Sequence, residues 1–268
     1  MIKKHSSNNF NMLTNCFTNF FSQVMTVKPM SLSQMSVAKE VQFFLFDSNA
    51  INKKTLDFLS EKHLHRNETL TLHQRKKPQA QQEFIISRIL IKQLFINGSD
   101  KSFHQIEIRF NKISLLLEVF YLDKRQPFSI SLSHSKGLIF IAISLNKVSL
   151  GVDIEHMNTK RDVNLLAKNY YHLTEVAQVE QRGVDAFYRI WTLKEAISKH
   201  LKQPIVTTLK HNIFEQLPLL SYRSGVYKDF DLSFVSKKTE CSSINNLINL
   251  FSPQDFLNLF TDTTYMDL

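Results

Sequence analysis

The spacing of apolar and polar residues after residue 40 predicts a mixture of strands and helices. Short apolar runs bounded by polar or turn residues predict strands at residues 41–46, 106–110, 115–122 and 138–143. The middle two are expected to form a hairpin around Asn111 and Lys112. Apolar residues three and four positions apart predict helices at residues 51–64 and 79–97. We therefore expect helices packed against strands.

One further strand carries two carboxylates on the same face. Residues 150–155 alternate Val152 and Ile154 with Asp153 and Glu155, and side chains two positions apart on a strand point to the same side. Adjacent carboxylates repel each other unless a cation lies near them. Taken alone, the pattern is more typical of an edge strand whose polar side faces water.

A helix later in the chain carries a third carboxylate. Apolar residues between positions 187 and 197 form a stripe that includes Trp191, which is most simply a core residue. Glu195 and Lys199 follow Trp191 at four-residue intervals and share one flank of the helix. Together with the paired carboxylates they indicate a divalent metal that holds a phosphate, because magnesium prefers a few hard oxygen ligands shared with phosphate. The ordinary alternative is a surface ion pair between Glu195 and Lys199.

The two ends of the chain are expected to differ from the middle. Residues 1–40 are polar and rich in Asn, Ser and Met, which predicts a poorly ordered extension. Strands are predicted at residues 215–221 and 227–235, followed by a terminal helix and polar tail within residues 242–268. No apolar run reaches the roughly 20 residues that a membrane helix requires, so no membrane is expected as a partner.

Charge narrows the choice of partners. The chain has 268 residues, a net charge of +9 and a pI near 9.4, which favours nucleic acid, an anionic membrane, a phosphorylated cofactor or an acidic protein. A basic nucleic-acid-binding protein would show Lys and Arg clustered with aromatic residues, whereas here they are scattered. Cys16 and Cys241 lack metal-ligand spacing, so a reduced, cytoplasmic protein is expected.

Three segments, in order, resemble the signatures of one known family. They are SLSHS at residues 131–135, GVDIE at residues 151–155 and WTLKEAISK at residues 191–199. Together they resemble the 4'-phosphopantetheinyl transferase superfamily, of the surfactin-synthetase-activating type that serves nonribosomal-peptide and polyketide synthases. The resemblance is strong over about residues 120–199 and faint over residues 41–96.

The resemblance implies a fold and a reaction. The fold would be α+β, a pseudo-two-fold pair of similar halves at residues 41–148 and 149–268 with the active site at their interface, after the extension of residues 1–40. The reaction would be Mg2+-dependent transfer of the 4'-phosphopantetheine arm of coenzyme A to a serine of an acidic acyl or peptidyl carrier protein, releasing 3',5'-ADP (holo-acyl-carrier-protein synthase activity). Chain length favours the larger monomeric class, which modifies carriers of secondary-metabolite, polyketide or polyunsaturated-fatty-acid synthases. No nucleic acid is expected as a partner.

The resemblance also implies a role for each residue of the motifs. Asp153, Glu155 and Glu195 are the expected metal ligands. Glu195 would help to deprotonate the attacking serine, and Lys199 and His134 would complete the catalytic residues as donors to phosphate oxygens. Contacts to coenzyme A are expected from Arg75, Lys77, Arg88, Lys124, Arg125, Ser133, His134, Lys194 and Lys199, with Lys194 facing outward or toward the rim of the site.

The sequence departs from the family at one position. Arg125 and Gln126 stand before Pro127 where the family has Gly-Lys-Pro, so Gln126 replaces the lysine that would approach the coenzyme phosphates. Lys124 or Arg125 can substitute only if the extended segment points one of these side chains toward the coenzyme phosphates, as the family's lysine would. This departure leaves open a homologue that binds coenzyme A or a carrier without turnover, although the intact carboxylates and Lys199 argue against it.

Overall fold

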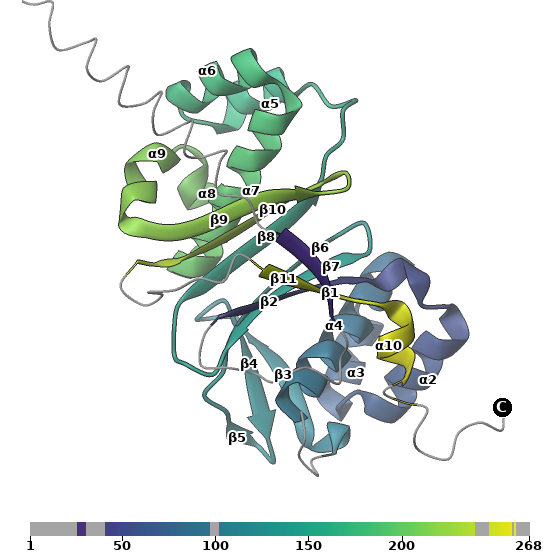
Figure 1. Ribbon diagram of the computed structural model, residues 1–268. Coiled ribbons are helices and arrows are strands. Elements are labelled where there is room, and N and C mark those ends of the chain that lie inside the picture. The colour runs from purple at the N-terminus through teal and green to yellow at the C-terminus, as the bar shows by residue number, and fades with distance from the viewer. Residues whose placement is uncertain (1–25, 31–40, 97–101, 239–246, 259, 261–268) are drawn as a thin grey trace, which may run out of the picture.

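The computed structural model describes residues 26–30, 41–96, 102–238, 247–258 and 260. Three sheets and the helices around them form two halves, one above the other in Figure 1. The fold is α+β, as the sequence predicted. The two-fold relation between the halves stays a prediction. Within the described residues no helix is long and apolar enough to cross a membrane.

The N-terminal half contains most of the strands and one long helix. Its elements are β2 (Gln42–Asp47), η2 (Ser48–Ala50), α2 (Lys53–His63), α3 (Arg66–His73), α4 (Pro78–Ile96), η3 (Phe103–Gln105), β3 (Ile106–Asn111), β4 (Leu116–Tyr121), β5 (Lys124–Arg125), β6 (Ser129–Ser135) and β7 (Leu138–Ser144). The predicted hairpin is confirmed, because β3 and β4 pair antiparallel from Ile106 opposite Tyr121.

The C-terminal half begins with the strand that carries the paired carboxylates. Its elements are β8 (Leu150–His156), α5 (Val163–Tyr170), α6 (Leu173–Arg182), α7 (Val184–Leu201), α8 (Ile205–Leu209), α9 (Ile213–Gln216), η4 (Leu217–Leu219), β9 (Leu220–Tyr227) and β10 (Phe230–Lys237). The chain then returns to the first half with β11 (Leu247–Phe251) and α10 (Pro253–Asn258), beside β1 (Thr26–Met30).

The largest sheet combines strands from both ends of the described chain. Its order is β1-β11-β2-β7-β6, with β11 parallel to both β1 and β2 and the other pairs antiparallel. In Figure 1 the yellow β11 lies beside the purple β1, and β11 also pairs with β2 on its other edge. The other two sheets, β8-β10-β9 and β3-β4-β5, are antiparallel throughout.

The five-stranded sheet and the β8-β10-β9 sheet face each other, and helices cover their outer faces. Phe44 and Phe46 of β2 pack into the apolar cluster beneath α2 and α4. Phe43 and Leu45, which point the other way, pack against β8 and β10, with the ring of Phe43 edge-on to Phe234 at 4.7 Å. On the far side of β8 and β10 lies α7, supported by α5 and α6. A strand buried on both faces reads as a continuous apolar run, which is why residues 41–46 were recognisable.

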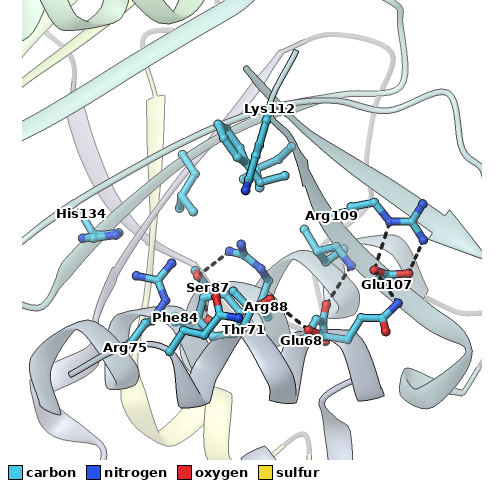
Figure 2. A pocket seen from close by; sticks show the side chains of 16 residues that line it. Glu68, Thr71, Arg75, Phe84, Ser87, Arg88, Glu107, Arg109, Lys112 and His134 are labelled. Carbon is cyan, nitrogen blue, oxygen red and sulfur yellow. Dashed lines mark hydrogen bonds and ion pairs between the residues drawn. The ribbon is translucent and has the colours of Figure 1, made fainter. Parts of the chain in front are cut away.

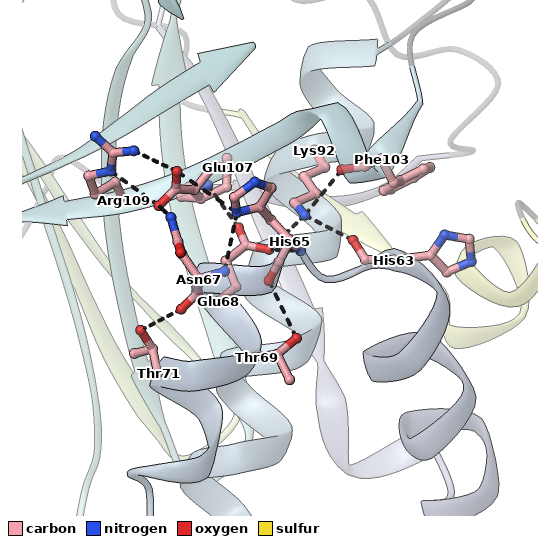
Figure 3. A network of polar contacts seen from close by, with 11 residues as sticks. His63, His65, Asn67, Glu68, Thr69, Thr71, Lys92, Phe103, Glu107 and Arg109 are labelled. Atoms are coloured by element: carbon pink, nitrogen blue, oxygen red, sulfur yellow. Dashed lines mark hydrogen bonds and ion pairs between the residues drawn. The ribbon is translucent and has the colours of Figure 1, made fainter. Parts of the chain in front are cut away.

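A buried ion pair ties the start of α3 to α4. His65 caps α3, and its backbone N–H donates to Glu68 at 2.8 Å. The Glu68 carboxylate lies 2.6 Å from Lys92 Nζ of α4, with both side chains buried. Lys92 also donates to the carbonyls of His63 and Phe103, at 2.9 and 3.3 Å. Figure 3 shows how this network joins α2, α3, α4 and β3.

The C-terminal half contains the same arrangement between α6 and α7. The backbone N–H of His172 donates to Glu175 at 3.1 Å, and Glu175 lies 2.9 Å from Lys194 Nζ, with neither side chain exposed. Lys194 also donates to the carbonyls of Thr208 and His211, at 3.2 and 2.6 Å. The expectation that Lys194 faces outward or toward the rim of the site is therefore wrong. Its three donors are taken by the protein, which leaves none for coenzyme A.

The ends of the chain differ from the sequence expectations. Residues 26–30, within the predicted poorly ordered extension, form β1, and the rest of residues 1–40 lies outside the described residues. The strand β11 joins the N-terminal sheet, although residues 149–268 were assigned to the C-terminal half. It covers an edge of β2 that would otherwise stay open. Residues 213–219 are helical rather than part of a strand, because Asn212 caps α9.

Candidate active site

Strand β8 and helix α7 approach each other so closely that one position must be glycine. A Cβ atom on residue 151 would lie 1.8 Å from the carbonyl oxygen of Ala196 and 2.8 Å from the backbone nitrogen of His200. Any side chain there would force the strand and helix apart. The glycine that opens the GVDIE motif is thus required by packing, and it lets the carboxylates of β8 lie beside the last turns of α7.

Asp153 has the most contacts in this region. Its Oδ1 accepts hydrogen bonds from Lys199 Nζ at 2.8 Å and from Ser133 Oγ at 2.7 Å. Lys199 Nζ also donates to the carbonyl of Val152 at 2.9 Å. The other oxygen, Oδ2, is buried and has no hydrogen-bond partner in the described part of the chain. Leaving a buried carboxylate oxygen without a donor is unfavourable, so this atom marks a position suited to a ligand donor or a cation.

Glu155 lies on the same face of β8, two positions further on. Its Oε2 accepts a hydrogen bond from Ser135 Oγ at 3.0 Å. Burial raises the pKa of Glu155, and the charge of Asp153 raises it further, against the opposing effects of Ser135, Lys199 and Arg161. The prediction that Asp153 and Glu155 share one strand face is confirmed.

Glu195 of α7 belongs to the same electrostatic group. Burial raises the pKa of Glu195 to about 7, and the charge of Asp153 adds to this effect, opposed by Lys199 and supported by Glu155. A carboxyl group with a pKa near 7 can accept a proton at neutral pH, which is the property of a general base. Three carboxylates thus influence one another, with the ammonium of Lys199 as the nearest compensating charge.

The carboxylates suit a hard divalent cation in their chemistry. Carboxylate oxygens are the ligands that Mg2+ prefers, Oδ2 of Asp153 has no donor, and the raised pKa values of Glu155 and Glu195 are those a cation would lower. Over the described ranges, however, no three His, Cys, Asp or Glu side chains lie close enough together to hold a metal ion. Lys199 supplies the positive charge at Asp153 instead. The metal-ligand role of the three carboxylates stays a prediction.

Alternate serines of β6 fasten the two halves together beside this group. Ser131 Oγ and Ser135 Oγ accept hydrogen bonds from backbone N–H groups of β8, at 2.9 and 3.1 Å. Ser133 lies between them and donates to Asp153. The sequence predicted that Ser133 offers its donors to coenzyme phosphates. In the structure its hydroxyl is bound to a carboxylate, so a phosphate contact through this hydroxyl would require that bond to break.

His134 points away from these serines, because side chains alternate along a strand. Its Nδ1 lies 2.8 Å from Oε2 of Glu83 on α4, and Oε1 of Glu83 accepts a hydrogen bond from Gly137 N–H at 2.8 Å. Burial acts to raise the pKa of Glu83, but the contacts of His134, Gly137 and Gln79 outweigh it and hold the pKa below its usual value. Glu83 therefore fixes the imidazole ring through Nδ1 and leaves Nε2 for a ligand.

His134 lines a cavity of about 560 Å³ between α4 and the β3–β4 hairpin. Figure 2 shows Arg75 and Arg88 rising from the helical side of this cavity and Lys112 reaching down from the hairpin side. Thr71 and Glu68 of α3 complete the helical wall. The cavity thus gathers basic side chains from three parts of the sequence.

Arg75 and Arg88 have no carboxylate partner among the described residues. Their guanidinium groups lie 4.6 and 4.3 Å from the centre of the Phe84 ring, and the Nε atom of each is buried without a hydrogen bond. Burial lowers the pKa of Arg88 to about 10, with Glu68 opposing and Arg75 adding to the shift. Burial also lowers the pKa of Arg75. Both remain cations at neutral pH, so the cavity suits a phosphate, which guanidinium groups bind in a bidentate manner.

Other predicted coenzyme contacts lie outside this cavity. Lys77 and Lys124 are exposed and are not among the lining residues. Arg125 is exposed and pairs with a glutamate of β4 at 3.1 Å. Sequence reasoning missed two basic lining residues, Arg109 and Lys112, and the one available signal was that Lys112 lies at the turn of the predicted hairpin. Arg109 is held by two hydrogen bonds to a glutamate of its own strand.

A smaller, mostly apolar cavity of about 250 Å³ lies next to the first one, on the side of α7. Phe110, Leu117 and Leu132 line both cavities. The wall nearest α7 includes Ser198 and Lys199. The two cavities therefore share an apolar wall, and Lys199, which pairs with Asp153, lies in the wall of the smaller one.

Comparison with known proteins points to one family. Residues 149–240 match the model of the 4'-phosphopantetheinyl transferase superfamily. The chain is also similar to the 4'-phosphopantetheinyl transferase AcpT of Salmonella typhi, with 38% identity over 77 residues, which cover 27% of this chain and 40% of that protein. The matched segment of this chain thus spans about two fifths of the length of that curated relative. The resemblance predicted from the motifs is confirmed over residues 149–240, which include the carboxylates and Lys199. The surfactin-synthetase-activating type stays a prediction.

Proposed function

We propose that this chain is a 4'-phosphopantetheinyl transferase that moves the phosphopantetheine arm of coenzyme A onto a serine of a carrier protein and releases 3',5'-ADP. One observation carries the proposal: Asp153, Glu155, Glu195 and Lys199 form a single charged group between β8 and α7. This group lies inside the segment that matches the superfamily.

The proposed reaction exchanges one phosphorus–oxygen bond for another. The serine oxygen forms a bond to the β-phosphorus of coenzyme A, and the bond from that phosphorus to the bridging oxygen breaks. The serine proton passes to Glu195, directly or through a water, which is the role that the family resemblance implies for this carboxylate. Charge grows on the leaving diphosphate oxygen, where Lys199 stabilises it with the N–H that is not bound to Val152 or Asp153.

In this proposal Asp153, Glu155 and Glu195 are the residues that would hold Mg2+. When bound, the ion supplies positive charge against the diphosphate oxygens. The unpartnered Oδ2 of Asp153 and the raised pKa values of the two glutamates support this assignment. Positioning and electrostatic neutralisation are the main contributions that a protein makes to phosphoryl transfer.

The nucleotide end of coenzyme A is proposed to bind in the larger cavity. Arg75 and Arg88 present guanidinium groups there whose Nε atoms have no hydrogen bond, and His134 presents Nε2 because Glu83 holds its other nitrogen. A phosphate between these donors would replace missing hydrogen bonds at both arginines. The smaller cavity lies next to this one and has Lys199 in its wall, so both anionic parts of the coenzyme would meet cations.

An acidic carrier protein is the proposed partner. Residues 196–214 contain three lysines and no Asp or Glu. Leu201 and Val206 in this segment are 47% and 70% exposed, and Ile113 at the facing hairpin is 96% exposed. An acidic protein with an apolar helix face would find both charge complementarity and apolar contacts on this rim. The family resemblance favours carriers of polyketide, nonribosomal-peptide or polyunsaturated-fatty-acid synthases and a monomeric enzyme.

The test is the intact mass of an apo carrier protein after incubation with this chain, coenzyme A and Mg2+. We expect the carrier to gain the mass of one phosphopantetheine arm. Glu195→Ala and addition of a chelator should each abolish the gain, and excess Mg2+ should restore it in the second case. Glu180→Ala, which removes a half-exposed glutamate of α6 from a surface ion pair, is the matched control and should leave the gain intact.

Two other results would change the conclusion. If several unrelated carriers gain no mass while coenzyme A still binds, the chain is a non-catalytic homologue, and Gln126 becomes the residue to examine. If coenzyme A does not bind at all, the proposed function is wrong.

A further inference from the structure

The residues next to Gln126 do not replace the lysine that the family has at that position. Arg125 pairs with a glutamate of β4, and the Gln126 side chain donates to the carbonyl of Lys124 at 2.8 Å. Neither Lys124 nor Arg125 lines either of the two cavities. The positive charge expected from this segment is therefore absent from the cavity wall.

Lys112 lies on that wall instead. It comes from the turn between β3 and β4, and its side chain is exposed and forms no ion pair within the described ranges. Figure 2 shows it extending from the hairpin side toward Arg75 and Arg88. It is thus a cation that is already at the cavity and is not held by any carboxylate.

The turn that carries Lys112 is fixed by its own hydrogen bonds. The side-chain oxygen of Asn111 accepts the backbone N–H groups of Ile113 and Ser114, at 2.9 and 3.1 Å. An Asn side chain that bonds to the next backbone N–H groups stabilises a tight turn. Lys112 therefore starts from a defined backbone position rather than from a loose loop.

The three unpaired cations match one phosphate monoester better than a diphosphate. Arg75, Arg88 and Lys112 line the larger cavity, whereas Lys199 lines only the smaller one, beyond the apolar side chains that the two cavities share. Coenzyme A likewise has two anionic parts, the diphosphate and the 3'-phosphate. If the diphosphate lies at the carboxylate group, Arg75, Arg88 and Lys112 are left to bind the 3'-phosphate.

We propose that Lys112 binds the 3'-phosphate of coenzyme A together with Arg75 and Arg88, and so supplies the positive charge that Gln126 lacks. This assignment rests on the proposed function, because it takes coenzyme A as the substrate. It makes a residue outside every sequence motif a determinant of coenzyme affinity and of the preference for the 3'-phosphorylated form.

The experiment compares the binding of coenzyme A and 3'-dephospho-coenzyme A by isothermal titration calorimetry. Lys112→Ala should weaken coenzyme A binding by about tenfold or more, as expected for a hydrogen-bonded charge pair, and should change 3'-dephospho-coenzyme A binding less than about twofold. Lys112→Arg, which keeps the charge, should retain most of the affinity. Lys124→Ala is the matched control, because Lys124 is an exposed lysine of the same sheet that lines neither cavity, and both ligands should bind it as they bind the wild type.

The possible failures are distinguishable. If Lys112→Ala binds coenzyme A as the wild type does, or weakens both ligands equally, Lys112 does not contact the 3'-phosphate. If Lys124→Ala instead weakens the binding of coenzyme A but not that of 3'-dephospho-coenzyme A, Lys124 replaces the missing lysine and the assignment to Lys112 is wrong. If the wild type binds neither ligand, the proposed function itself fails before Lys112 is tested.

Discussion

At the scale of single residues, Glu83 shows what a motif omits. It belongs to none of the signatures, yet it binds both His134 and the backbone of Gly137, which lies 54 positions away. The sequence identified His134 from its neighbours in the strand. It could not identify the partner, because nothing in the spacing of α4 reveals which of its polar residues lies beneath the β6–β7 turn.

We predict that Glu83→Ala weakens coenzyme A binding by about tenfold. The substitution removes the acceptor that fixes the ring of His134 and leaves Gly137 N–H without a partner. Turnover at saturating coenzyme A should change less, because Glu195 and Lys199 are untouched. Titration calorimetry and steady-state kinetics on folded protein provide the measurement. Glu61→Ala, at an exposed glutamate of α2, is the control, and equal affinities for the two variants would contradict the role of Glu83.

His63 is a second residue whose surroundings matter, because they determine how it affects stability at different pH values. Burial lowers the pKa of His63 from 6.5 to about 4, and the charges of His104 and Lys92 add to the shift. Its ring contacts those of Phe103 and Phe260, each at 4.9 Å. Because the pKa of His63 is lower in the folded chain than in the unfolded chain, the unfolded chain binds more protons than the folded one between about pH 4 and pH 6.5. The contribution to stability is therefore complete above about pH 6.5 and is lost as the pH falls toward 4.

We predict that His63→Phe reduces the loss of unfolding free energy between pH 6.5 and 4. The difference should be on the order of 1 kcal/mol, since solvent screens a partly exposed ring. Urea unfolding at several pH values would measure it. His73→Gln alters an exposed histidine of α3 and should leave the pH dependence as in the wild type. Identical profiles for wild type and His63→Phe would show that the ring does not contribute.

At the scale of elements, the contact between β8 and α7 determines whether the carboxylates form one group. We predict that Gly151→Ala abolishes transfer, because its Cβ would overlap the carbonyl oxygen of Ala196 and push α7 away from Asp153. The carrier mass assay measures the loss, and circular dichroism tests whether the variant is folded.

Gly183→Ala is the matched control for this substitution. Gly183 has φ +65 but open space around it, so alanine there adds backbone strain of about 1–3 kcal/mol without moving α7 against β8. It should lower the melting temperature and keep transfer activity below that temperature. A folded, fully active Gly151→Ala variant would disprove the requirement for close approach.

The buried pair between α6 and α7 leads to a prediction about stability. Lys194→Met should cost about 3 kcal/mol or more of unfolding free energy, because Glu175 stays buried without its cation. Adding Glu175→Gln should recover part of this loss. Lys168→Met removes a half-exposed ion pair between α5 and α6 and should cost less than about 1 kcal/mol. Denaturant titrations of the four proteins test the ranking, and equal losses for the two lysines would refute it.

Elements were predictable where one periodicity dominated. Strand β2, the β3–β4 hairpin, α4 and α7 each carry a continuous or regularly spaced apolar pattern, and the structure has them close to the expected positions. Residues 215–219 were expected as strand, but the cap at Asn212 and the proline at 218 favour short helical turns. Local capping outweighed the apolar pattern there, which is the common failure of reasoning from periodicity alone.

At the scale of the whole molecule, the motifs located the carboxylate group but not the full basic cavity. Asp153, Glu155, Glu195 and Lys199 come from two neighbouring elements, so two motifs sufficed to find them. The cavity instead combines the α3–α4 connection, α4, β6 and the β3–β4 turn. Which lysine reaches it depends on how the hairpin sheet lies over β6, and that relation is set by packing between distant segments.

The proposed carrier surface also spans distant segments. We predict that Ile113→Glu lowers kcat/KM for an acidic carrier by about tenfold, because it places a like charge and removes an apolar contact on the rim. Coenzyme A affinity should stay within about twofold of the wild type. Val226→Glu, at an exposed apolar residue of β9, is the control. Equal kcat/KM values for the two variants would show that the carrier does not dock at Ile113.

The position of β11 has a consequence for how the chain is made. Asn249 bonds to Phe43 across 206 positions, and β11 separates β1 from β2 in the largest sheet. During synthesis, the first half therefore cannot close its sheet as it leaves the ribosome, and β2 keeps an unpaired apolar edge until almost the whole chain has emerged. Contacts of such long range slow folding and expose edges to aggregation. This protein should depend on chaperones during translation more than its compact halves suggest. Ribosome-bound fragments that end before residue 247 should therefore bind chaperones.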